Sequence, residues 1–434
     1  MSKIDEPTPG GPEAADEPSG EAARKAQMAV PPELVAGSAG EYLRTSIARI
    51  RGGESGILPV VGGLILISIL FQSLNSNFLT ARNLVDLLVQ AAVFSLLAIG
   101  EVFVLLLGEI DLSSGYVAAI GGTVVADLVG PAHGWPWWVA IALGLLACAG
   151  IGLIHGLIIT QLGLPSFVVT LAGLLFWEGV DLRILGNGGT IPINDNVIIN
   201  IASANLSNTA GWIVMLVIVG LFGAMTWRRD AKRRGAGLVA PPPNVTLLKI
   251  GGALLAGIGV VVLCNTDRGI FAPVSGVPYV VLLVLAVLGV ATFVLGRTKL
   301  GRYLYAIGGS AEAARRAGVN LAMIRTTAFV MCSFTAGIAG IVYASRLRSI
   351  STSVNGGTLV LYAIAAAVIG GTSLFGGRGK AMHGVLGGIV IAAIYNGMGL
   401  VGFSAPAQYM VTALVLLAAV IIDAQAHRGR VGTT

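Results

Sequence analysis

The sequence has very little charge. Only 11% of its 434 residues are Asp, Glu, Lys or Arg, whereas hydrophobic residues make up 55%. A soluble domain normally carries about 25% charged residues. This shortage excludes an ordinary soluble domain and indicates an integral membrane protein. The net charge of +6 does not indicate a nucleic-acid partner, because Lys and Arg gather in a few loops between apolar runs.

Catalytic and metal-binding residues are also scarce. Cys148, Cys264 and Cys332 lie in or beside apolar runs without metal-ligand spacing, and we interpret them as small packing residues. No Ser-His-Asp, Cys-His or metal constellation is placed for catalysis. We therefore expect no enzyme activity, no metal and no cofactor bound by this chain.

The chain also lacks an ATP site. Gly376-Gly-Arg-Gly-Lys380 is glycine-rich, but a phosphate-binding P-loop needs Gly-x-x-x-x-Gly-Lys-Ser/Thr. Position 374 is Leu, and Lys380 is followed by Ala. Energy for any transport must therefore come from a partner or from an ion gradient.

Long apolar runs dominate the rest of the sequence. A membrane span needs about 20 mostly apolar residues. Twelve runs qualify, at about 57–74, 83–107, 114–130, 136–160, 165–185, 211–227, 246–264, 277–296, 322–346, 358–374, 384–402 and 407–423. We expect an all-α polytopic membrane protein with about twelve transmembrane helices, some of them broken near 108–116 and 371–383.

The two ends of the chain differ from this membrane part. Residues 1–40 are rich in Pro, Gly, Ala and Glu, which favours disorder, and we assign 1–50 to a disordered N-terminal tail. We expect a transmembrane domain over 51–425 and a C-terminal tail over 426–434. The first apolar run must serve as the insertion signal, since no cleavable signal peptide precedes it.

Basic residues indicate the orientation. They cluster before the first run and after the sixth, eighth, tenth and last, which places every cluster on one side of the membrane. Under the positive-inside rule both termini are cytoplasmic. The longest loop on the opposite side is 186–210, whose polar residues include Asn187, Thr190, Asn194 and Asp195.

A weak internal repeat is present. Gly108-Glu-Ile-Asp-Leu-Ser-Ser-Gly115 aligns with Gly370-Gly-Thr-Ser-Leu-Phe-Gly-Gly377. Each copy follows an Ala-rich apolar run and precedes a Gly-containing one. The repeat predicts two weakly related halves that point the same way around a central path.

Acidic residues lie inside one apolar stretch. Glu101, Glu109 and Asp111 precede Ser113 and Ser114. A central Asp costs about 2.5–3.5 kcal/mol on insertion scales, so such residues are usually paired or face a cavity. They form either the substrate path or hinge of a broken helix, or helix caps and interhelical hydrogen bonds.

A short basic segment separates two apolar runs at 299–321. Within it Glu312-Ala313-Ala314 and Gly318 form the pattern Glu-Ala-Ala-x-x-x-Gly, with Arg315 and Arg316 between them. This pattern resembles the coupling loop of ABC-importer permeases, whose short helix inserts into a cleft of an ATPase. We expect a coupling helix at about 308–319. The alternative is an amphipathic surface helix with solvated arginines.

Several stretches, taken in order, resemble the monosaccharide ABC permeases of the ribose/xylose/galactose type over about 57–425. They are Gln90–Gly115, Leu164–Gly173, Gly301–Gly309 with Glu312-Ala-Ala, and Val368–Gly377. Glu109, the stretch Gly189–Asp195 and the extra pair of runs over 211–264 resemble the D-xylose branch of this family. The acidic tail departs from the family pattern.

The resemblance implies a transport complex in the cell inner membrane. Two copies of the permease would bind two cytoplasmic ATPase subunits that carry ATP and Mg, and an extracytoplasmic sugar-binding protein would dock on loop 186–210. Alternating access would move a monosaccharide, D-xylose in this branch, into the cytoplasm.

A neutral sugar is bound by hydrogen-bonding groups and aromatic faces without a fixed charge. Asp86 and Gln90, one turn apart, together with Asn396 and Gln408, suit this chemistry, although each also suits a structural hydrogen bond. The rival class is an ion-coupled secondary transporter that uses Glu101, Glu109 and Asp111. It explains the buried acids but not the Glu312 helix.

Overall fold

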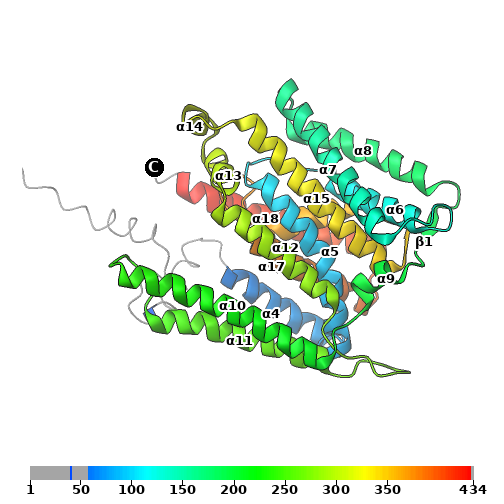
Figure 1. The fold of residues 1–434 in the computed structure, drawn as a ribbon, viewed down its shortest axis with the longest axis horizontal. Helices are drawn as coiled ribbons and strands as arrows, with labels where there is room; N and C mark the ends of the chain where they lie inside the picture. Colours follow the sequence, from blue (N-terminus) through cyan, green and yellow to red (C-terminus); the bar gives the residue numbers. More distant parts are fainter. Residues whose placement is uncertain (1–39, 42–56, 432–434) are drawn as a thin grey trace, which may run out of the picture. The chain divides into compact units, whose positions relative to one another are not determined.

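The computed structural model describes residues 40–41 and 57–431, and these are mostly helical (Figure 1). The predicted N-terminal tail lies outside the described residues, apart from Gly40 and Glu41. The helices are α4 (Ile57–Leu74), α5 (Ala81–Leu105), α6 (Ser114–Val129), α7 (Trp137–Leu162), α8 (Ser166–Leu185), α9 (Asn196–Ser203), α10 (Asn208–Gly235), α11 (Pro243–Asn265), α12 (Tyr279–Arg297), α13 (Lys299–Gly309), α14 (Ala311–Arg316), α15 (Leu321–Leu347), α16 (Gly356–Ile369), α17 (Ala381–Val401) and α18 (Ala405–Val431).

Each of the twelve apolar runs forms a helix. Seven of these helices are long and apolar enough to cross a membrane, namely α5, α7, α10, α11, α12, α15 and α17. Shorter apolar helices are α6, α16 and parts of α4 and α18. An all-α polytopic membrane protein is thus supported, and the number of twelve crossings stays a prediction.

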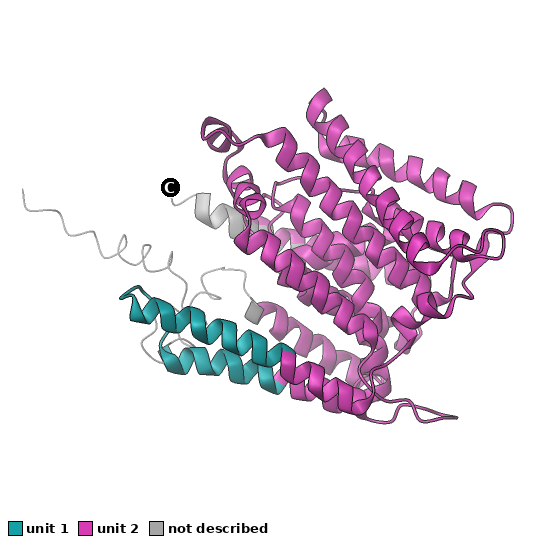
Figure 2. Cartoon of the chain, viewed as in Figure 1, with its two compact units in different colours: residues 1–52, 218–255 teal, residues 53–217, 256–434 magenta. Residues whose placement is uncertain are grey.

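The chain divides into two compact units, 1–52 with 218–255 and 53–217 with 256–434 (Figure 2). In the first unit, the described part holds the basic end of α10 and the start of α11. Asp230 is buried there and accepts hydrogen bonds from Arg229 Nε at 2.9 Å and Thr246 Oγ1 at 3.0 Å. A paired buried carboxylate of this kind fixes α10 to α11 within the unit.

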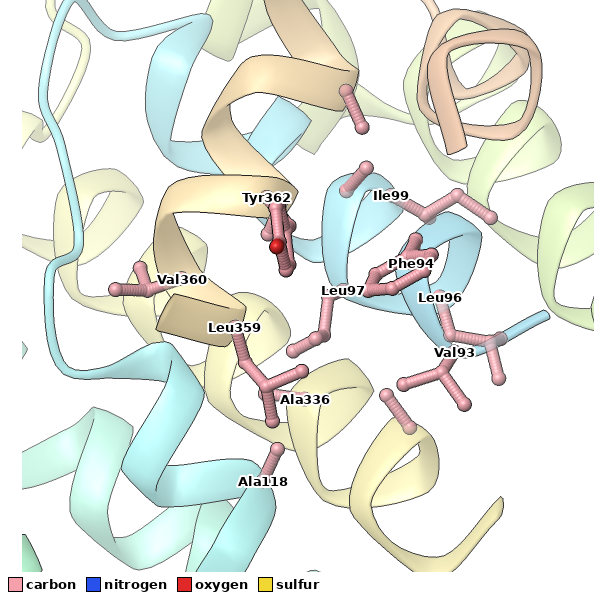
Figure 3. Packing of buried hydrophobic residues seen from close by; sticks show 14 of the residues in the cluster. Val93, Phe94, Leu96, Leu97, Ile99, Ala118, Ala336, Leu359, Val360 and Tyr362 are labelled. Atoms are coloured by element: carbon pink, nitrogen blue, oxygen red, sulfur yellow. The ribbon is translucent and has the colours of Figure 1, made fainter. Parts of the chain in front are cut away.

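In the second unit, α5 is enclosed by other helices. It packs against α12, α15, α16 and α17. In its most apolar stretch of 18 residues, 89% is buried, compared with 11% for the corresponding stretch of α11. Figure 3 shows Phe94 and Leu97 of α5 beside Tyr362 and Leu359 of α16. The apolar pattern alone does not distinguish such an enclosed helix from one that faces lipid.

Two helices of this unit end in the same way. After α5, the amide of Glu109 bonds to the carbonyl of Val104, and Gly108 has a φ of 76°. After α16, the amide of Thr372 bonds to the carbonyl of Ala367, and Gly371 has a φ of 111°. Both ends are Schellman motifs, in which glycine takes the left-handed position without strain. Helices α14 and α17 end in the same way at Gly318 and Gly402, so the motif does not test the internal repeat, which stays a prediction. The two ends match Gly108 to Gly371, one residue away from the sequence alignment.

Loop 186–210 contains regular structure that the sequence did not reveal. Strand β1 (Thr190–Pro192) pairs antiparallel with β2 (Ser349–Ser351), and α9 follows. The Asp195 side chain caps α9 by accepting the amides of Val197 and Ile198 at 2.9 and 3.0 Å. Strands of three residues are too short to show an alternating pattern.

The segment with the Glu-Ala-Ala pattern is two helices rather than one. Ser310 is extended, with φ −162° and ψ 106°, and separates α13 from α14. Its hydroxyl caps α14 by accepting the amide of Ala313 at 3.2 Å. The helix with the pattern therefore begins at Ala311 rather than near 308 and ends at Arg316 rather than near 319, because the Ser310 cap and the Gly318 turn limit it.

Candidate functional site

A cavity of about 180 Å³ lies in the second unit between α5, α15, α16, α17 and α18. Its aromatic lining is Phe94, Tyr343, Tyr362, Tyr395 and Tyr409. Its polar lining is Gln90, Arg346, Ser353, Asn355, Thr358 and Gln408. The combination offers both flat apolar faces and hydrogen-bonding groups, which suits a small polar ring.

Gln90 has a spare acceptor at this cavity. Its Nε2 donates to Asp86 Oδ2 at 2.5 Å, whereas its Oε1 is buried without a hydrogen-bond partner. A buried unpaired acceptor costs about 1–3 kcal/mol. A hydroxyl group of a bound molecule could remove this cost.

Arg346 is the charged residue in the cavity lining. Its Nη2 lies 3.8 Å from Asp86 Oδ1, and the Asp86 side chain is 53% exposed. Asp86 is not part of the lining, so it compensates the charge of Arg346 only from beside the cavity.

The aromatic residues form a connected wall. The ring of Phe94 meets Tyr362 edge-on at 5.3 Å, and Tyr395 contacts both rings at 6.0 Å. The three rings come from α5, α16 and α17, so this aromatic side of the cavity forms only when these helices pack together. Edge-to-face packing of this kind holds the rings in place.

Among the other predicted path residues, Gln408 lines the cavity and Asn396 does not. Asn396 Oδ1 accepts a hydrogen bond from Asn83 Nδ2 at 2.9 Å. This bond joins α17 to α5. The alternative of a structural hydrogen bond therefore describes Asn396 in this conformation.

The acids predicted with Gln90 lie elsewhere. Glu101 and Asp111 are fully buried and absent from the cavity lining. Glu101 Oε1 accepts from Ser114 Oγ at 2.6 Å, and Asp111 Oδ1 accepts from Ser113 Oγ at 2.6 Å and Ser113 N at 2.9 Å. Of the nine predicted residues, Gln90 and Gln408 line the cavity and Asp86 lies beside it, Asn396 joins α17 to α5, and the other five, Glu101, Glu109, Asp111, Ser113 and Ser114, lie apart from the cavity near the connection of α5 to α6.

These five residues connect several helices. Ser113 Oγ lies 3.2 Å from His155 Nδ1, and His155 Nε2 accepts the indole N–H of Trp177 at 3.0 Å. Asp111, at the start of α6, is linked in this way to α7 and α8. Glu109, between α5 and α6, forms an ion pair with Arg325 of α15 at 2.9 Å. This arrangement suits a hinge or a cap better than a path for solute.

The helix with the Glu-Ala-Ala pattern is mostly exposed. Glu312 and Arg316 form an ion pair at 3.0 Å, with exposed fractions of 61% and 80% for Glu312 and Arg316. Ala313, Arg315 and Gly318 are exposed as well, and Ala314 is buried. Gly318 has a φ of 80° at the exit turn, which glycine adopts readily. In the described part of the chain nothing covers these side chains.

Residues 83–420 match the family described as branched-chain amino acid transport system / permease component. The chain belongs to this permease family. The description of the family names permease components of transport systems.

Curated relatives of this permease include sugar permeases. The chain is 34% identical to the xylose transport system permease protein of Escherichia coli K12, over 87% of the chain and 95% of that protein. It is 36% identical to the Haemophilus influenzae xylose permease over 80% and 90%. It is 31% identical to the ribose import permease protein of E. coli K12 over 83% and 91%. No solved structure gave a significant match.

The residues predicted for receptor docking lie on one loop of the permease. Asn187, Thr190 and Asn194 are exposed, while Asp195 is half-buried. Asp195 is used as the cap of α9, and Thr190 pairs with Ser351. Both therefore have structural partners, and their part in docking stays a proposal.

Sequence reasoning missed much of the cavity lining of the permease. Tyr343, Arg346, Asn355, Tyr362 and Tyr409 lie on helices far apart in the sequence. Polar and aromatic residues inside apolar runs were the available signal. Among the described residues, no group of three or more His, Cys, Asp or Glu is placed to hold a metal ion.

Proposed function

We propose that this chain is the transmembrane permease subunit of an ATP-driven importer that carries a monosaccharide into the cytoplasm by alternating access, with D-xylose as the sugar. The observation that carries the proposal is the likeness to xylose permeases over nearly their whole length. The identity to the ribose permease is only slightly lower. The choice of xylose therefore needs its own test.

The cavity supports the choice of cargo. Gln90 offers an unpaired acceptor, Asp86 lies beside the lining residue Arg346, and Tyr362 contributes one of several aromatic rings. We assign Asp86, Gln90 and Gln408 to the sugar path. We assign Glu101, Glu109, Asp111, Ser113 and Ser114 to a hinge, and Asn396 to a structural contact between α17 and the start of α5.

Weak binding at this cavity would suit an importer. Conduction requires that a site be favourable enough to enter and weak enough to leave. Tight binding of the sugar then belongs to a separate extracytoplasmic protein, which we propose docks near Asn187, Thr190, Asn194 and Asp195.

The proposed complex contains two copies of this chain in the cell inner membrane, with both termini in the cytoplasm. Two ATPase subunits would bind ATP and Mg and would contact α14 through Glu312, Ala313, Arg315 and Arg316. Relatives that are named as permease components of transport systems support such an assembly. The exposed face of α14 supplies the contact surface.

Uptake of labelled D-xylose tests the proposal. Cells would express this chain with its transport partners, ribose and galactose would serve as competitors, and the proton gradient would be collapsed while ATP is maintained. We expect uptake to persist and to be blocked only by excess xylose.

Two results would contradict it. Loss of uptake with the gradient would favour the ion-coupled alternative that uses Glu101, Glu109 and Asp111. Competition by ribose at least as strong as that by xylose would move the cargo to ribose while leaving the ATP-driven class intact.

A further inference from the structure

The two glycine-rich connections of the predicted repeat meet each other. Loop A is residues 106–113, between α5 and α6, and loop B is residues 370–380, between α16 and α17. The carbonyl of Leu106 accepts the amide of Gly377 at 2.9 Å. The two loops are therefore joined directly through their backbones.

The end of α13 lies against this junction. A methyl group at Gly308 would collide with the carbonyl oxygen of Leu106 and the amide nitrogen of Gly377, and it would lie 3.0 Å from Gly377 Cα. The next residue differs, because a methyl group at Gly309 would meet nothing within 4 Å. Only glycine at 308 allows α13 to approach both loops at once.

A hydrogen bond holds α13 to loop B. Tyr305 Oη donates to the carbonyl of Gly379 at 2.7 Å. Gly379 lies two residues before α17 begins. Tyr303, on the same helix, is exposed, and its hydroxyl makes no hydrogen bond among the described residues. Tyr305 and Gly308 lie nearly one turn apart, so they present one face of α13 to the loops.

The contact of α13 with loop A also connects it to the proposed hinge. Loop A contains Glu109 and Asp111, and Glu109 is paired with Arg325 near the start of α15. Helix α15 follows α14 after a short turn. A displacement of α13 and α14 would therefore press on loop A and loop B directly and would move α15 as well.

We propose that the contact of Tyr305 and Gly308 with loops A and B is the junction that transmits movement of α14 to α6 and α17. Tyr305 and Gly308 are positioning residues, since neither lines the sugar cavity. This inference rests on the proposed coupling role of α14. The inference specifies that the movement is transmitted to loops A and B together rather than to a single helix.

Two matched pairs of variants test the junction. Gly308→Ala is compared with Gly309→Ala, and Tyr305→Phe with Tyr303→Phe. Each variant is assembled with its ATPase and sugar-binding partners in proteoliposomes. The readouts are sugar uptake, stimulation of ATP hydrolysis by the loaded binding protein, co-purification of the ATPase, and thermal stability.

We expect Gly308→Ala and Tyr305→Phe to lower uptake per ATP hydrolysed by about tenfold, within the range of typical coupling free energies. Co-purification and basal ATP hydrolysis should stay at the level of the parent. Gly309→Ala and Tyr303→Phe should match the parent in all readouts. If the Gly308→Ala variant does not assemble with its partners, the comparison of Tyr305→Phe with Tyr303→Phe alone tests the junction.

Normal coupling in Tyr305→Phe and in an assembled Gly308→Ala would overturn the junction. Equal losses in the control variants would overturn it too, because the effect would not depend on this contact. These outcomes are separate from failure of the proposed function. If α14 did not bind the ATPase, Glu312→Arg would leave co-purification intact, whatever the Gly308 variants did.

Discussion

Gln90 shows at the scale of a residue how a membrane helix can hold a polar side chain for a ligand. One end of its amide is engaged by Asp86, and the other end is buried without a partner at the cavity. Buried polar atoms are usually paired, but Glu101, Glu109 and Asp111 also carry an unpaired buried oxygen. Gln90 differs from these three acids because it lines the cavity, where a bound hydroxyl group can reach its acceptor.

Replacement of this residue gives the first prediction. Gln90→Ala should lower sugar uptake several-fold, up to about tenfold, because one hydrogen bond to a neutral group contributes about 0.5–1.5 kcal/mol. Initial rates of labelled xylose uptake at several concentrations would measure the effect. Gln161→Ala, at an exposed position near the end of α7, is the control and should behave like the parent. Unchanged uptake by Gln90→Ala would remove Gln90 from the proposed path.

The sequence predicted part of this site. Gln90 and Gln408 were recognised because polar residues are conspicuous inside apolar runs. Glu101 and Asp111 were conspicuous for the same reason, yet they hold helices together in the interior. Sequence shows that a polar residue is unusual in its helix, but the packing of helices decides whether it meets a cavity or another side chain.

At the scale of elements, α14 is a six-residue helix with a cap at each end. Ser310 closes its start, and Gly318 closes its exit turn. A helix this short has little stability of its own. Its position therefore depends on α13 and α15 at its two sides.

The second prediction concerns Glu312→Arg. The ion pair with Arg316 is an exposed i,i+4 pair, worth about 0.3–0.5 kcal/mol, so its loss should hardly change stability. Reversal of the charge on the exposed face should instead abolish co-purification with the ATPase and abolish uptake. Membrane insertion and thermal stability serve as controls, and Glu312→Gln should have an intermediate effect. Unimpaired co-purification of the Arg variant would argue against docking at α14.

Elements were predicted with uneven success. All twelve apolar runs are helices, because burial in a low-dielectric environment requires every backbone group to bond within its own segment. The short strands β1 and β2 were missed, since their pairing depends on residues far apart in sequence, such as Ile191 and Ile350. The division of α13 from α14 was missed. Ser310 was an available signal, because serine is preferred at helix N-caps.

At the scale of the whole molecule, the distribution of basic residues should fix the orientation. With twelve crossings, loop 186–210 faces outward and the basic end of α10 faces the cytoplasm. The three native cysteines are free and buried, so they should react little with an added probe. Single exposed cysteines can therefore report on each side.

The third prediction uses this low background. Asn187→Cys should react with a membrane-impermeant maleimide added to intact spheroplasts, whereas Lys232→Cys should react only after the membrane is permeabilised. Both positions are exposed. The parent chain measures the background, and denaturation shows that each cysteine is present. Labelling of Lys232→Cys from outside would contradict the proposed orientation and the count of crossings.

The Schellman ends of α5 and α16 have a further consequence for water at these helix ends. A helix that stops usually needs water for its last carbonyl groups, and a column of water could carry protons or ions. Here Glu109 and Thr372 return bonds into the helices they follow. These bonds satisfy carbonyl groups that would otherwise need water, so the two helix ends require fewer water molecules than uncapped ends would.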